Sequence, residues 1–124
     1  MDNRKINRQI AEKVMGWEAI KGWGWMDGRR PAQVSSDIED WRPSTNIAHA
    51  FEAEAKAFKL GFCVYLCRLL DGRFCCRVWK KKDLKSQQFL KTVAVKEADT
   101  PAMAISTALI AAFEAVKGED DGNV

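Results

Sequence analysis

The stretch that decides the fold is residues 62–81, which read FCVYLCRLLDGRFCCRVWKK. Two runs of β-branched, aromatic and cysteine residues flank Asp71 and Gly72. An Asp-Gly pair favours a two-residue type I′ turn, because both central positions of that turn need positive φ. The pattern therefore predicts a β-hairpin in which Leu70 opposes Arg73.

Counting outward from this turn assigns every hairpin residue to one face of the sheet. One face is apolar and is expected to meet helices; its members are Tyr65, Cys67, Leu69, Phe74, Cys76 and Val78. The opposite face mixes apolar and cationic side chains; its members are Phe62, Val64, Leu66, Arg68, Arg73, Cys75, Arg77, Trp79 and Lys81. We expect the second face to be half core and half solvated.

All four cysteines of the chain fall inside these strands, at Cys63, Cys67, Cys75 and Cys76. In the predicted register Cys75 points through the face opposite to the other three, so four thiolates cannot converge on a tetrahedral zinc ion. Strand cysteines without a loop-rich framework are typical of reduced core thiols in a cytosolic protein. The sequence predicts no metal site and no cofactor.

Helical periodicity precedes the hairpin twice. A first helix is capped by Asp2 or Asn3, carries apolar residues every fourth position and ends at Gly16. A second begins near residues 43–45 and ends at Gly61. Its predicted core stripe is Ile47, Phe51, Ala55 and Phe58.

After the hairpin, residues 89–96 predict a third strand, and Thr100-Pro101 predicts the start of a last helix that ends before Gly118. The fold class is therefore α+β: a three-stranded antiparallel sheet, made of the hairpin plus one strand, sandwiched by three helices. With 124 residues the chain is expected to form one domain over 1–118, followed by an acidic disordered tail over 119–124. No signal peptide or membrane-spanning segment is predicted.

Residues 17–42 form an irregular, tryptophan-rich segment in which helical and strand periodicity disappear. Indole faces stack on bases, and guanidinium groups pair with phosphate in a bidentate way. The combination predicts a site for an anionic, nucleotide-like ligand, made of Trp23, Trp25, Arg29, Arg30, Trp41, Arg42, Arg77 and Trp79. The alternative is that the tryptophans anchor the segment in the core.

Signals for catalysis are weak. His49 is the only histidine, and it lies off the predicted core stripe of the second helix. Glu52 and Glu54 could supply an acid and a base, but carboxylates on a solvated helix face are common. Phosphate-binding glycine motifs are absent from the sequence. We therefore predict a protein that is not an enzyme.

Three strings, together with the order of elements, resemble the phage ABA sandwich domain, a family of small bacteriophage proteins. They are IAEKVMGW at 10–17, WRPSTNIA at 41–48 and ADTPAMAI at 98–105. The resemblance implies an α-β-α sandwich encoded by a phage or prophage and located in the cytoplasm of the infected bacterium. It brings no catalytic residues to this chain.

The resemblance suggests a counter-defence factor that sequesters a nucleotide-like immune signal, and we expect it to be a homo-oligomer. The alternative is an inhibitor that docks onto a host defence protein through exposed tryptophans. A third hypothesis is a double-stranded RNA-binding module, whose cations would stand at the start of the last helix. Residues 98–103 carry no cation, so this hypothesis ranks third.

Overall fold

The structure, a computed structural model, describes residues 2–20, 24–28, 30–31, 40–81 and 89–122. Its elements are α1 (Asn3–Gln9), the π-helical turn η1 (Ile10–Val14), β1 (Glu18–Ile20), β2 (Gly24–Asp27), β3 (Arg30–Pro31), α2 (Ile47–Lys59), β4 (Phe62–Arg68), β5 (Phe74–Lys81), β6 (Phe89–Ala98) and α3 (Pro101–Gly122). The predicted α+β class is confirmed.

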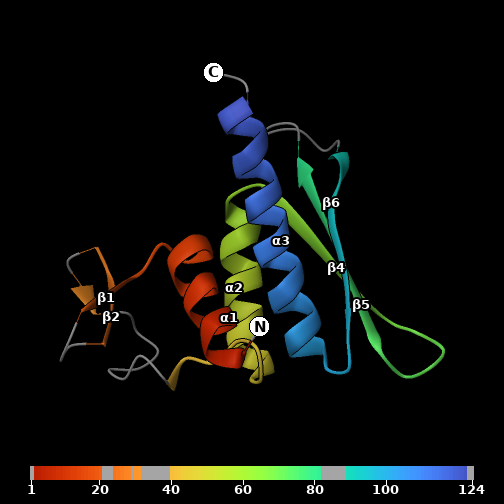
Figure 1. The fold of residues 1–124 in the computed structure, drawn as a ribbon, viewed down its shortest axis with the longest axis horizontal. Coiled ribbons are helices and arrows are strands. Elements are labelled where there is room, and N and C mark those ends of the chain that lie inside the picture. The colour runs from red at the N-terminus through yellow and green to blue at the C-terminus, as the bar shows by residue number, and fades with distance from the viewer. Residues whose placement is uncertain (1, 21–23, 29, 32–39, 82–88, 123–124) are drawn as a thin grey trace.

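The main sheet is antiparallel, with the order β4-β5-β6, so it consists of the predicted hairpin plus one strand. Among the described elements, all three helices lie on the same side of this sheet (Figure 1). α2 packs on β4, α3 packs on all three strands, and α1 with η1 packs on the two longer helices. The described residues therefore cover the sheet on one face only, and the expectation of helices on both faces is wrong.

The hairpin is confirmed, but its predicted register is wrong by one residue. Arg68 pairs with Phe74, and Leu69 N–H donates to the Arg73 carbonyl at 2.7 Å. Gly72 N–H donates to the Leu69 carbonyl, and φ is positive at Gly72. The loop thus has three residues, with Gly72 in the left-handed position that a G1 bulge requires. The Asp71 carboxylate accepts from Arg73 N–H, which fixes this turn without a positive φ at Asp71.

A one-residue shift moves the whole of β4 onto the opposite face relative to β5. The face that meets the helices now carries Phe62, Val64, Leu66, Phe74, Cys76 and Val78. Tyr65 and Cys67, which we predicted to lie in the core, are on the outer face instead. Phe62 stacks on Phe113 of α3, with 4.4 Å between ring centroids, which fixes the helix on the sheet.

Helix α2 buries a different face from the one that we predicted. Its buried residues are Ala50, Ala53 and Ala57, whereas Phe51 is 49% and Phe58 is 56% exposed. The N-cap is Asn46, whose side chain accepts from the N–H groups of two residues in the first turn, rather than a residue of 43–45. Gly61, with positive φ, follows the last turn as predicted. Small side chains allow α2 to approach its neighbours closely, and its large side chains are left outside.

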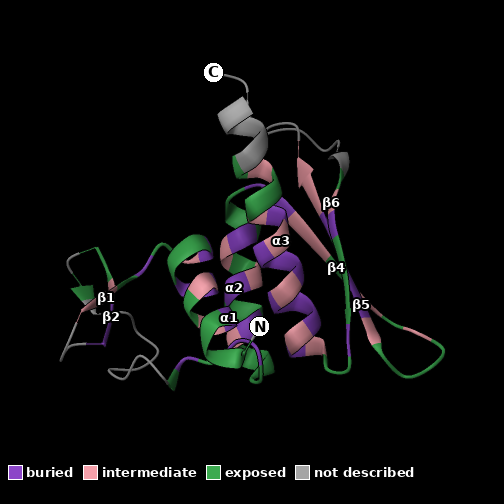
Figure 2. Cartoon of the chain, viewed as in Figure 1, coloured by how far each residue is buried: buried purple, intermediate pink, exposed green. Residues whose placement is uncertain are grey.

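The other helices follow the sequence more closely. Asp2 caps α1 by accepting from Lys5 N–H, and Gly16 has the positive φ expected after a helix end. Thr100 Oγ1 accepts from Met103 N–H at the start of α3. Figure 2 shows α3 coloured mainly as buried or intermediate along its first turns. α3 continues to Gly122, so the predicted helix end at Gly118 is wrong and the acidic residues 119–121 prolong the helix.

Residues 17–42 are not wholly irregular, as we had predicted. β1, β2 and β3 form a second antiparallel sheet in that order. Trp25, in β2, pairs with Ala19 of β1. This small sheet lies on the far side of the helices from the main sheet (Figure 1). These three strands escaped prediction because each has only two to four residues, too few to show a period.

Candidate functional site

Three tryptophans of residues 17–42 form a core cluster: Trp17, Trp25 and Trp41. Trp25 is 2% and Trp41 is 1% exposed, and both belong to the main hydrophobic core with Trp17. The ring centroids of Trp17 and Trp41 are 4.7 Å apart in an edge-to-face arrangement, and those of Trp17 and Trp25 are 6.4 Å apart. Such packing leaves these indoles no free face for a ligand, so the prediction of Trp25 and Trp41 as ligand-stacking residues is wrong.

Trp41 is anchored to helix α2 by two contacts. Its Nε1–H donates to the Glu52 carboxylate at 3.2 Å, and its ring stacks on His49 with 6.0 Å between centroids. His49 Nδ1 in turn accepts from Arg42 N–H at 2.9 Å. Burial of an indole is most favourable when its N–H has an acceptor. His49 and Glu52 therefore hold residues 41–42 on α2 and have a structural role.

The remaining predicted site residues do not converge. Arg30 lies in β3 of the small sheet, whereas Arg77 lies in β5 of the main sheet, and the helices stand between the two sheets (Figure 1). Arg42 is exposed beside the buried Trp41. Trp23 and Arg29 lie outside the described residues. The six predicted site residues that the structure describes therefore do not form a single groove.

The outer face of the main sheet brings two of the predicted residues together. Tyr65 stands opposite Arg77 across β4 and β5, and Trp79 lies on the same face two residues along. The Tyr65 and Trp79 ring centroids are 6.1 Å apart, tilted by 56°. Tyr65 is 54% exposed, and Val95 of β6, which pairs with Arg77, is exposed as well. We call Tyr65, Arg77 and Trp79 the outer-face cluster.

Sequence reasoning identified Arg77 and Trp79 but missed Tyr65, because the wrong register placed it among the core residues. No signal in the sequence could have recovered it, since the choice between a two-residue and a three-residue loop decides its face. At one end of the outer face the charges are already paired. The Arg73 guanidinium lies 3.5 Å from both the Glu97 and the Asp99 carboxylates. Arg77 is exposed, and no carboxylate of the described residues forms such an ion pair with it.

The corrected register also redistributes the cysteines. Cys63, Cys67 and Cys75 are on the outer face, and Cys76 points into the core. Burial, and secondarily the charges of Glu54, Cys75 and Cys67, raises the pKa of Cys76 from 9.0 to about 12, so this thiol stays protonated at neutral pH. In the part of the chain that the structure describes, no three His, Cys, Asp or Glu side chains are grouped to hold a metal ion.

The carboxylates that could have served as acid and base on α2 lie in unlike surroundings. Burial raises the pKa of Glu54 above its usual value. Glu52 accepts the hydrogen bond from Trp41. Since Glu52 already serves to hold the tryptophan, the pair resembles a structural arrangement more than a catalytic dyad.

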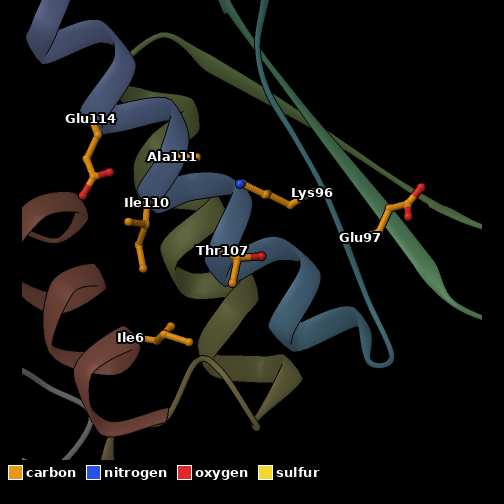
Figure 3. Close-up of a pocket in the computed structure, with 7 residues that line it drawn as sticks. All are labelled: Ile6, Lys96, Glu97, Thr107, Ile110, Ala111 and Glu114. Carbon is orange, nitrogen blue, oxygen red and sulfur yellow. The ribbon is translucent and has the colours of Figure 1, made fainter. Parts of the chain in front are cut away.

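A hollow of about 310 Å³ lies beside α3, away from the outer-face cluster (Figure 3). Ile6 and Ile110 give it an apolar wall, and Lys96 extends toward α3 while Glu97 points away from the hollow. Glu114 at its rim is held by Lys13 at 2.9 Å. A second hollow, of about 280 Å³, is lined by both partners of this ion pair together with Phe113 and Lys117. Neither hollow contains a residue of the predicted site.

In comparisons with protein families, curated proteins and solved structures, nothing matches this chain. The resemblance to the phage ABA sandwich domain therefore stays a prediction. Within the ranges that the structure describes, none of the helices combines the length and the apolar character needed to cross a bilayer.

Proposed function

We propose that this chain is a non-enzymatic binding protein that docks onto a partner protein through the outer face of the main sheet. The observation that carries the proposal is the outer-face cluster on a sheet face that no described element covers. Tyrosine, tryptophan and arginine are the residues that most often dominate the binding energy of protein interfaces. Three of them adjoining on an open, rigid sheet form a suitable anchor.

The shape of this face favours a protein partner over a small ligand. Small-molecule sites are concave and bury most of the ligand surface. The two hollows described above lie along α3, on the helix side of the sheet, and not at the outer-face cluster. Trp25 and Trp41, two of the tryptophans predicted to stack on a nucleotide, are buried in the core. A broad partner surface can engage an open sheet face without a cavity.

The resemblance to phage proteins suggests the kind of partner. A small phage protein that binds without catalysis would act as an inhibitor of a host defence enzyme in the bacterial cytoplasm. Exposed Arg77, which pairs with Tyr65 and lies two residues from Trp79, favours a partner surface with a carboxylate, because guanidinium pairs with carboxylates in a bidentate way.

The experiment is an affinity capture from bacterial lysate with four forms of the full chain: the unaltered chain, Arg77→Glu, Trp79→Ala and Leu70→Ala. Leu70 is fully exposed at the hairpin tip, away from the cluster, and serves as the matched control. We expect one stoichiometric protein, retained by Leu70→Ala and lost with the other two variants. Equal recovery by Arg77→Glu and the unaltered chain would contradict the proposal.

A second candidate uses the same face. Arg77 flanked by Tyr65 and Trp79 also has the composition of a site that stacks a base and pairs its phosphate. Under this hypothesis the ligand is an anionic nucleotide-like signal, and its binding would change the fluorescence of Trp79. Titration with cyclic and linear nucleotides, using Trp79→Phe as the control, distinguishes the two candidates. Saturable quenching that disappears in Trp79→Phe supports the nucleotide, and its absence leaves the protein partner.

A further inference from the structure

An apolar stripe runs along the outer side of α2. Ile47 is 37%, Phe51 is 49% and Phe58 is 56% exposed, and the exposed Ala55 lies between them. These positions follow the i, i+4, i+8, i+11 spacing that places residues on one helix face. Soluble monomers rarely expose large contiguous apolar patches, and such patches often mark interaction sites. We call these four residues the α2 stripe.

The edge of the sheet next to α2 is also open. Leu69 N–H donates to Arg73, and Lys81 N–H donates to Gly61, so the odd-numbered residues of β4 exchange hydrogen bonds with β5. The backbone groups of Val64 and Leu66 therefore point to the free edge. In the described residues β4 has a hydrogen-bonded neighbour on one side only.

The two edges of the sheet are protected differently. β6 pairs with β5 through two register shifts and carries Lys96 and Glu97, and bulges and charges are the usual devices against edge-to-edge pairing. β4 pairs without a register shift, contains no proline and carries its single charge at Arg68, its last residue. β4 is thus the edge that lacks protection against a further strand.

The α2 stripe and the β4 edge belong to one side of the molecule. α2 packs on β4 and joins it through Leu60 and Gly61. Lys81 Nζ lies 4.8 Å from the centroid of the Phe58 ring, which places the end of the stripe beside the start of the hairpin. At ~1.5 Å per helical and ~3.3 Å per strand residue, the two elements have similar lengths of about 20 Å. A single partner can therefore cover both.

The charges beside the stripe fit a second copy of this chain. Glu52 and Lys59 are exposed, seven residues apart, and lie on one flank of the stripe. When two α2 helices pack antiparallel about Ala55, Glu52 of each copy faces Lys59 of the other. The small side chain of Ala55 at the crossing point permits close approach.

We propose that α2 and the free edge of β4 form a twofold interface with a second copy of this chain. The two β4 strands pair antiparallel about Tyr65, and the two α2 helices lie antiparallel above them, so that the same residues contribute from both sides. The sheet then has six strands, and its outer face carries two outer-face clusters. This inference stands independently of the proposed function, because it uses a different surface.

The first test is the dimer dissociation constant of the full chain, measured by sedimentation equilibrium. Phe51→Asp places a charge in the middle of the stripe, and we expect the dissociation constant to rise by about tenfold or more. Leu70→Asp introduces the same charge on another exposed apolar residue and should leave self-association unchanged. A chain that is monomeric at all accessible concentrations, or that dimerises equally well as Phe51→Asp, overturns the proposal.

The second test uses charge reversal, which keeps the stripe intact. Lys59→Glu alone and Glu52→Lys alone each place like charges opposite each other and should weaken the homodimer. Mixed in equal amounts, the two variants restore both opposite-charge contacts, so they should form a heterodimer as tightly as the unaltered homodimer. Glu52→Gln removes the charge but keeps an acceptor for Trp41 Nε1–H, so a weaker homodimer of this variant reports the loss of the charge alone. Failure of the mixture to associate more tightly than either variant alone contradicts the twofold arrangement.

Discussion

Helices α2 and α3 bury side chains of different sizes. α3 buries large apolar residues, among them Ile105 and Leu109, against the sheet and its neighbouring helices. α2 buries alanines and turns Phe51 and Phe58 outward. Both helices show an apolar stripe in the sequence, and Ile105 and Leu109 of the α3 stripe lie in the core.

The difference teaches that a stripe of large apolar residues marks a surface that is to be covered. The stripe does not specify whether the same chain or another molecule covers it. α3 lies in the middle of the chain's own elements, so its stripe meets them. α2 lies at the β4 edge of the sheet, where the described elements pack on its alanine side. A helix at the edge of a fold can reserve its larger apolar residues for another molecule.

The largest expected effect contrasts the two stripes directly. Leu109→Ala removes a fully buried side chain of α3 and should lower the free energy of unfolding by about 2–5 kcal/mol. Phe51→Ala removes an exposed ring and should lower it by less than about 1 kcal/mol when the chain is monomeric. Denaturant unfolding at low protein concentration measures both. Equal losses would break the contrast between the helices.

Overpacking tests the alanine side of α2. Ala53 is fully buried, and Ala53→Leu should destabilise the protein by about 1–3 kcal/mol because a close helix contact must open. Ala55 is exposed, so Ala55→Leu should leave the monomer's unfolding free energy within about 0.5 kcal/mol of the original. Thermal and denaturant unfolding of the two variants provide the measurement. A harmless Ala53→Leu would show that this side is not the packed one.

The hairpin register, which decides which face meets α2 and α3, depends on Gly72. Its φ of +91° is unfavourable for an L side chain, although an added Cβ would meet no atom within 4 Å. We therefore expect Gly72→Ala to cost about 1 kcal/mol, purely from backbone conformation. Gly72→Asn should cost less, because asparagine tolerates the left-handed region. An Ala variant as stable as the original would argue for a different turn.

The smallest effect concerns pH and the core face of β5. The folded protein keeps Cys76 protonated up to a pKa of about 12, whereas the thiol of the unfolded chain ionises near its ordinary value of 9.0. The unfolded state thus loses a proton first, so this contribution to stability is complete below pH 9 and declines as the pH rises toward 12. Cys76→Val should show a shallower decline in unfolding midpoint between pH 8 and 11 than the original chain. Parallel declines would place Cys76 outside the core.

Much of the fold could be predicted from the sequence, since it rests on local signals. The hairpin, the third strand, the capping by Asp2 and Thr100 and the end of α2 at Gly61 depend on residues close to one another in the chain. The register could not be predicted, because Asp71 can occupy either a two-residue or a three-residue loop. In the structure the loop has three residues, and the Asp71 carboxylate accepts a hydrogen bond from the backbone N–H of Arg73.

The site was less predictable for a physical reason. Tryptophans that anchor a core and tryptophans that stack on a ligand can have the same spacing in the sequence. Only the packing around the indole distinguishes the two roles. The edge-to-face contact of Trp17 with Trp41 and the acceptor at Glu52 settle Trp41 as core. Trp79 lies on the outer face because side chains alternate along β5, whichever register β4 adopts.

The central claim, that the α2 stripe and the β4 edge are covered by a second copy, is tested most directly by amide hydrogen exchange in β4. The account predicts that the Val64 and Leu66 amides, which face the free edge, exchange more slowly as protein concentration rises. The Tyr65 amide, which faces β5, should change much less. Exchange of Val64 and Leu66 that is fast and independent of concentration would contradict the claim.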